Sequence, residues 1–253
     1  MGGPAVSQID QQVRSASLGA MPQEIRLLDD ILLHMNHGLV PLSGARNDRG
    51  LNFLAELLLH RAFGSLWRAR EDAVCGYPVQ SLTLCRAALE DWGTLRYIES
   101  HPDEIGFWLR GVLPEIKACG RPPKFSRIWK ELGEVGGTVN EAYSVLSKFA
   151  HPRDSGLPWL FHADAEKVYF HTGGHFDQGG LRTCLYFLVL VGQPFSERVA
   201  QLQFRVLGNP VPDWVGEGKR IYGEVLQFIE RVHDEVLTGP EAQGLLRSEP
   251  YED

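Results

Sequence analysis

Residues 51–100 read LNFLAELLLHRAFGSLWRAREDAVCGYPVQSLTLCRAALEDWGTLRYIES. On both sides of the turn at 76–78, apolar residues recur every three or four positions, which is the period of a helix with one buried side. Pro78 suits the first position of a helix, because its nitrogen has no hydrogen that would lack a partner there. Two long helices joined by so short a turn should pack antiparallel.

The same helical period extends over most of the chain. An N-cap residue and a capping box mark two of the helix starts, since Asp177 precedes one apolar run and Thr138 is followed three residues later by Glu141. Pro194 leaves open whether the helix that starts at Asp177 continues or restarts. Together with 51–73 and 78–99, helices are predicted at about 22–36, 102–113, 125–132, 138–150, 177–207 and 214–237. The predicted class is therefore all-α, a helical bundle in which more than half of the residues are helical.

One segment departs from the helical period. Around Asp164, aromatic and β-branched residues gather on both sides, in WLF at 159–161 and VYF at 168–170. Such residues favour strands, so a small β-hairpin insertion is predicted near 157–172. The predicted organisation is then a loose N-terminal arm (1–20), a single helical domain (21–238) and a mobile C-terminal tail (239–253).

Composition excludes some classes of protein. The chain has 253 residues and a formal net charge of −7, which argues against a uniformly basic nucleic-acid binder but leaves room for a local basic patch. Its four cysteines are scattered, as is usual for thiols in a reducing compartment. The longest apolar run, 184–191, is far shorter than the ~20 residues of a membrane span. We therefore expect a cytoplasmic protein with no membrane partner.

Polar residues at helical spacing form the main candidate site. Tyr143, Ser147 and His151 share one face of a predicted helix, and Arg86 and Glu90 lie one turn apart on another. If the two faces meet, arginine, serine and tyrosine could bind a phosphate, and histidine could move a proton. The alternative is a buried polar network that only fixes the register of the helices.

Two short motifs carry a family resemblance. The segments LCRAALE (84–90) and LSKFAHP (146–152), with Tyr97 between them, resemble a bacterial all-helical family of unknown function. That family is similar to the HEPN bundles (higher-eukaryote and prokaryote nucleotide-binding domains) of toxins and defence systems. The resemblance covers about 50–205 and implies a helical binding or interaction module in bacterial defence or stress response.

The HEPN ribonuclease motif is broken in this chain. Active members carry an arginine, four to six residues and then a histidine on one helix, but positions 144–146 before His151 are Ser, Val and Leu. Only Arg86 or Arg153 could replace the missing arginine. The resemblance thus favours a binding module, and the alternative is an RNA- or nucleotide-directed enzyme that uses Arg86 and His151.

A basic stretch is the second candidate site. It contains no acidic residue and is interleaved with Phe125 and Trp129, a combination that suits phosphate contacts with base stacking. The alternative is a solvated helix face, with the two aromatics in the core. The candidate nucleic-acid-binding residues are Lys117, Arg121, Lys124, Arg127 and Lys130.

Four histidines lie around the predicted hairpin, near Asp164 and Asp177, but no pair has a recognised metal-ligand spacing. They are His151, His162, His171 and His175. Neither a metal nor a cofactor is predicted, because no dinucleotide fingerprint or phosphate-binding loop occurs.

Long apolar stripes on paired helices often complete their core against a second copy, so a twofold homodimer is predicted.

Overall fold

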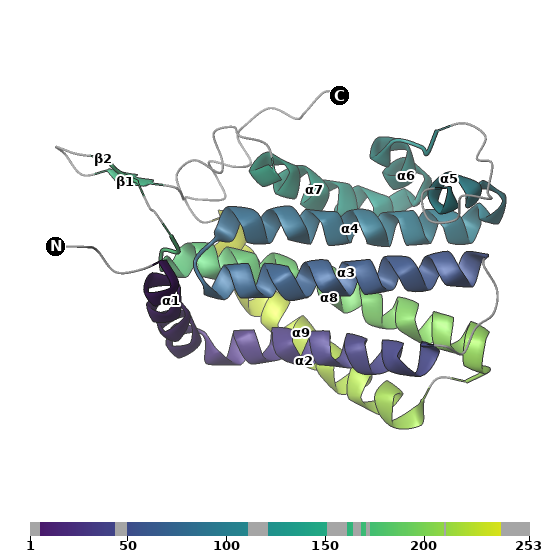
Figure 1. The fold of residues 1–253 in the computed structure, drawn as a ribbon, viewed down its shortest axis with the longest axis horizontal. Coiled ribbons are helices and arrows are strands. Elements are labelled where there is room, and N and C mark those ends of the chain that lie inside the picture. The colour runs from purple at the N-terminus through teal and green to yellow at the C-terminus, as the bar shows by residue number, and fades with distance from the viewer. Residues whose placement is uncertain are drawn as a thin grey trace.

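The computed structural model describes residues 6–43, 50–110, 121–150, 161–163, 168–170, 173–209 and 211–238 (Figure 1). Well over half of the chain is helical, which confirms the predicted all-α bundle. The helices are α1 (Val6–Ala20), α2 (Pro22–Leu39), α3 (Leu51–Val74), α4 (Pro78–Ser100), α5 (Gly106–Leu109), α6 (Phe125–Glu131), α7 (Gly133–Ala150), α8 (Gln178–Leu207) and α9 (Pro212–Thr238), with 3-10 turns η1 (Val40–Leu42) and η2 (Pro102–Glu104).

The antiparallel pair of α3 and α4 forms the centre of the bundle (Figure 1). At the turn between them, Gly76 has a φ of 80° and its backbone lies directly against that of His175, whose N–H donates to the Gly76 carbonyl at 3.2 Å. Only glycine fits there, because a Cβ would collide with the His175 backbone and the left-handed conformation is unfavourable for other residues.

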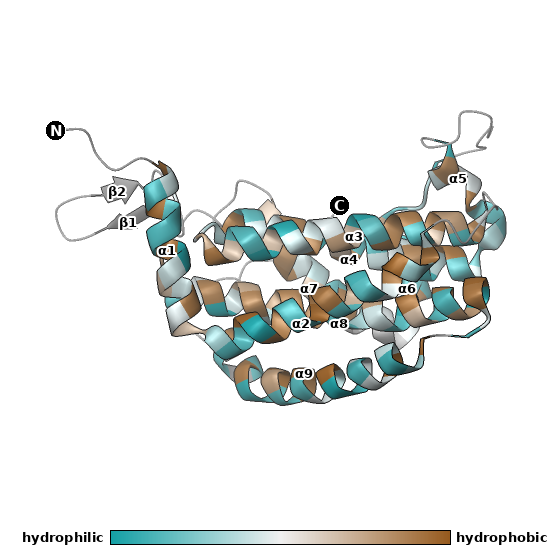
Figure 2. Cartoon of the chain, turned by 60° about the horizontal axis from the view of Figure 1, so that its bottom comes forward, coloured by the Kyte–Doolittle hydropathy of each residue, from teal (hydrophilic) through white to brown (hydrophobic). Residues whose placement is uncertain are grey.

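The remaining helices cover the two sides of this pair. Helices α6 and α7 pack on α4, whereas α2 and α8 pack on α3, and α9 closes the bundle against α2 and α8. Figure 2 shows how polar and apolar residues alternate along α9, and Ile221, Val225 and Phe228 are buried on its inner side. A connected cluster of buried apolar side chains extends from Met21 to Val236.

The predicted loose N-terminal arm is wrong for residues 6–20, which form α1. Val13 is buried, and Asp10 accepts hydrogen bonds from the Tyr77 hydroxyl at 2.7 Å and from the Gly174 N–H at 3.3 Å. Arg14 forms an ion pair with Glu71 at 2.5 Å. This helix is docked by polar contacts to distant residues, and a local apolar period cannot reveal such contacts.

Two helix boundaries were open or misplaced in the prediction. The Thr138 capping box does not start a helix, because α7 begins five residues earlier and runs through it. Gly133, with a φ of 64°, lies two residues after the end of α6 in the left-handed conformation and is the first residue of α7. Pro194 lies inside α8, so this helix continues past the proline instead of restarting.

Strands β1 (Phe161–Ala163) and β2 (Val168–Phe170) pair antiparallel, with Phe161 opposite Phe170. Residues 157–160, 164–167 and 171–172 of the predicted hairpin lie outside the described residues, so the hairpin insertion as a whole stays a prediction. The tail predicted at 239–253 also lies outside them. No helix in the described ranges is long and apolar enough to cross a membrane.

Candidate functional site

Arg86, Glu90 and Tyr143 meet where α4 packs against α7. The Arg86 Nε donates to Glu90 Oε1 at 3.1 Å, and its Nη2 donates to the Tyr143 hydroxyl at 2.8 Å. That hydroxyl in turn donates to Glu90 Oε1 at 3.2 Å. The guanidinium carbon also lies 4.9 Å from the centre of the Tyr143 ring. The two helices thus hold one arginine from two sides.

This arginine keeps hydrogen-bonding capacity. Of the five N–H groups of a guanidinium, those on Arg86 Nη1 have no partner within the part of the chain that the structure describes. The side chains of Arg86 and Glu90 are 21% and 25% exposed, so water reaches both. The cluster is therefore a half-open polar site and not a sealed core network.

An aromatic wall of Phe125, Trp129 and Tyr143 borders the cluster. Ring centres lie 5.6 Å apart for Phe125 and Trp129, and 5.5 Å apart for Trp129 and Tyr143. The indole ring of Trp129 can approach α4 this closely only because residue 93 is glycine, since a Cβ there would collide with the edge of the ring. The indole N–H of Trp129 is buried without a partner in the described chain. The wall fixes the position of Tyr143, and through it that of Arg86.

Tyr143 acts here as a neutral hydroxyl. Burial raises the pKa of Tyr143, and the negative charge of Glu90 raises it further, against the smaller opposing effect of Arg86. The phenol therefore remains protonated at neutral pH. It can donate or accept a hydrogen bond, but it is not a base.

The structure brings together three of the five predicted site residues. Ser147 does not join them, because its hydroxyl donates to the backbone carbonyl of Tyr143 on the same helix, at 2.7 Å. His151, predicted as the proton carrier, lies outside the described residues.

The predicted basic stretch is distributed over an exposed surface. Arg127 pairs with Glu131 at 2.8 Å and lies 5.8 Å from the centre of the Tyr97 ring. Trp129 is buried and Phe125 packs against the core, which confirms their interpretation as core contacts instead of stacking platforms. Arg121, Lys124 and Lys130 are exposed, and Lys117 lies outside the described residues.

Of the four histidines around the predicted hairpin, only His175 has a described side chain. His151 and His171 fall outside the described residues, only the backbone of His162 is described, and the side chain of His175 is exposed. The described residues contain no group of three or more histidine, cysteine or acidic side chains that could hold a metal ion.

Sequence reasoning missed an ion pair between α3 and α4. The Arg61 Nε lies 2.8 and 3.0 Å from the two carboxylate oxygens of Asp91, and Nη2 also contacts that carboxylate. A signal was present, because Asp91 occupies a position on the buried stripe of α4 between Ala88 and Leu95. An acid in such a place requires a cationic or hydrogen-bonding partner.

No protein-family model, curated protein or solved structure matches the chain. The HEPN resemblance thus rests on the two motifs and stays a prediction. Their described parts, 84–90 on α4 and 146–150 on α7, belong to helices that pack against each other.

Proposed function

We propose that this chain is a helical binding module of HEPN-like type that recognises a phosphate-bearing ligand, a nucleotide or RNA, through Arg86. The supporting observation is the geometry of that side chain, which Glu90 and Tyr143 hold while Nη1 has no partner among the described residues. Arginine binds phosphate through its planar set of N–H groups, and a guanidinium held in advance loses less conformational entropy on binding.

Charge limits the affinity that we expect. Glu90 offsets the charge of Arg86, so the site attracts anions by directed hydrogen bonds more than by a strong field. One phosphate contact on a single strand lowers log K by about 0.7 for each tenfold rise in salt. A salt slope near this value supports a site centred on Arg86, whereas a much steeper slope indicates the exposed basic stretch.

Binding is favoured over catalysis by the groups that the site contains. Tyr143 stays protonated, Glu90 is engaged by both Arg86 and Tyr143, and the family's ribonuclease motif is broken before His151. The second candidate function is an RNA- or nucleotide-directed enzyme. It is kept because His151 continues the four-residue spacing of Tyr143 and Ser147 in the sequence.

The proposal is tested by fluorescence anisotropy with a labelled single-stranded RNA pool, competed by ATP. Arg86→Ala should weaken binding tenfold or more, a loss of about 1.4 kcal/mol. Arg205→Ala is the matched control, because Arg205 is also a partly exposed arginine paired with a glutamate, Glu99, on another part of the bundle. Equal affinity of wild type and Arg86→Ala, or no binding by wild type, would reject the proposal.

A gel of the same RNA pool separates the two functions. RNA that stays intact after long incubation, with or without chelator, supports a binding module. Degradation that is abolished in both Arg86→Ala and His151→Ala would establish the enzyme instead.

The proposal also includes a twofold homodimer in the cytoplasm of a bacterium, in a defence or stress setting that the HEPN resemblance implies. Sedimentation velocity tests the assembly. A single species at the 28.3 kDa chain mass, at protein concentrations of tens of micromolar, would reject the dimer, because an obligate dimer should not dissociate there.

A further inference from the structure

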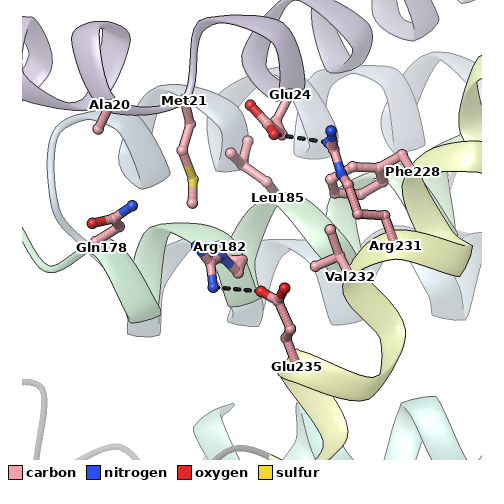
Figure 3. Close-up of a pocket in the computed structure, with 10 residues that line it drawn as sticks. All are labelled: Ala20, Met21, Glu24, Gln178, Arg182, Leu185, Phe228, Arg231, Val232 and Glu235. Atoms are coloured by element: carbon pink, nitrogen blue, oxygen red, sulfur yellow. Dashed lines mark hydrogen bonds and ion pairs between the residues drawn. The ribbon is translucent and has the colours of Figure 1, made fainter.

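A cavity of about 250 Å³, broadly open to solvent on one side, lies where the junction of α1 and α2 meets the start of α8 and the end of α9 (Figure 3). Its apolar lining consists of the exposed Ala20 and the buried Met21, Leu185, Phe228 and Val232. The four buried residues belong to the hydrophobic core, so the cavity adjoins that core. An apolar group that entered it would leave water.

Two ion pairs flank this apolar lining. Arg182 on α8 pairs with Glu235 on α9 at 2.6 Å, and Arg231 on α9 pairs with Glu24 on α2 at 2.8 Å. Figure 3 shows Leu185 and Val232 between the two pairs. The cavity therefore combines an apolar interior with a rim that carries two positive and two negative charges.

The balance of charges selects the chemistry of a ligand. A simple anion would have to displace a glutamate from its arginine and leave that carboxylate without a partner. A zwitterion can replace both partners at once, because its carboxylate forms an ion pair with the arginine and its ammonium forms one with the glutamate. The Arg182–Glu235 pair is the more open of the two, since Glu24 is mostly buried and Arg231 also lies 5.9 Å from the centre of the Phe228 ring.

The volume of the cavity limits the size of the ligand. At the volume that each water molecule occupies in liquid water, the cavity corresponds to about eight water molecules. It is smaller than the pockets of roughly 300–1,000 Å³ that hold drug-sized compounds. A free amino acid with one large apolar side chain fits both limits.

We propose that this cavity binds a free amino acid with a branched or aromatic side chain. The side chain occupies the apolar interior, the carboxylate contacts Arg182 and the ammonium contacts Glu235. This site is separate from Arg86, and neither proposal depends on the other.

Isothermal titration calorimetry with L-phenylalanine, L-leucine and L-tryptophan on the full chain tests the proposal. At least one should bind, with a Kd on the order of 1 mM or tighter. L-phenylalaninamide lacks the carboxylate, while 3-phenylpropanoate and N-acetyl-L-phenylalanine lack the ammonium. Each should bind tenfold or more weakly than L-phenylalanine does. Absence of binding by all three amino acids would overturn the proposal, as would equal binding of 3-phenylpropanoate and L-phenylalanine.

Variants of the rim locate the binding. Arg182→Gln and Glu235→Gln should each weaken the best amino acid tenfold or more, and Ala20→Trp should abolish binding by filling the space beside Ala20, which is an exposed position. Arg220→Gln is the control, because Arg220 of α9 is also a partly exposed arginine and pairs with a glutamate, Glu224, away from this cavity. Unchanged binding in both rim variants, or an equal loss in the control, would overturn the assignment.

Discussion

Helix α4 carries two neighbouring acids, Glu90 and Asp91, and each pairs with an arginine in a different way. The side chain of Asp91 is 1% exposed and accepts hydrogen bonds from Arg61 of α3. The side chain of Arg61 is itself 64% exposed. Glu90 pairs with Arg86 on its own helix, and both are partly exposed beside α7. In the first pair the arginine covers a buried carboxylate. In the second, the carboxylate and Tyr143 position an arginine whose Nη1 has no partner among the described residues.

This difference separates a structural pair from a candidate site. A buried carboxylate that loses its partner destabilises the fold, since nothing else can solvate it. A partly hydrated arginine that loses its carboxylate can turn to water. Adjacent positions on one helix should therefore respond very differently to mutation.

The largest expected effect is that of Arg61→Ala. Removing the guanidinium leaves the Asp91 carboxylate buried and unpaired, and we expect the free energy of unfolding to fall by about 3 kcal/mol. Urea denaturation measures this loss, and RNA binding by the folded variant should not change. A loss below 1 kcal/mol would show that water reaches Asp91.

The loss in Arg61→Ala should also depend on pH. Burial raises the pKa of Asp91 even beside Arg61, and without the arginine this pKa rises further. Because the folded state then binds a proton more readily than the unfolded state, stability increases as the pH falls through the raised pKa toward the pKa of the unfolded chain. Denaturation at pH 7 and pH 5 should thus show a smaller loss at pH 5. The double variant Arg61→Ala, Asp91→Asn should lack this difference.

Gly93→Ala tests the aromatic wall beside Arg86. The added methyl group meets the Trp129 ring, so the indole must move and α6 must shift from α4. We expect a loss of about 2 kcal/mol and altered tryptophan fluorescence. Gly64→Ala on α3 is the control, since its Cβ would meet no atom within 4 Å, and it should be neutral or slightly stabilising. Equal stability of the two variants would contradict this packing.

The smallest effect is expected for Glu90→Ala. Because Arg86 is partly exposed and keeps its contact with Tyr143, the free energy of unfolding should fall by only about 1 kcal/mol. Thermal denaturation of Glu90→Ala and Arg61→Ala under the same conditions compares the two losses of stability directly. A loss as large as that of Arg61→Ala would mean that the Arg86 cluster is also structural.

The predictable part of the fold was the part that local periodicity determines. The turn at 76–78 predicted the antiparallel α3 and α4, and the one-turn spacing of Arg86 and Glu90 predicted the contact between two of the three residues of the cluster. Helix α1 was missed because Asp10 and Arg14 dock it on residues more than fifty positions away. The partner of Asp91 could not be chosen either, because the facing position on α3 depends on how the two helices are rotated against each other. Ser147 was misplaced because serine in a helix can donate to its own backbone.

The most direct test of the proposed site observes the two arginines together. In a ¹⁵N-labelled protein, the Nε–Hε signals of Arg86 and Arg61 are assigned from Arg86→Lys and Arg61→Lys, and AMP or a short RNA is titrated. The account predicts that the Arg86 signal shifts in a saturable manner while the Arg61 signal stays in place. An unmoved Arg86 signal, or an equal shift of both, would contradict it.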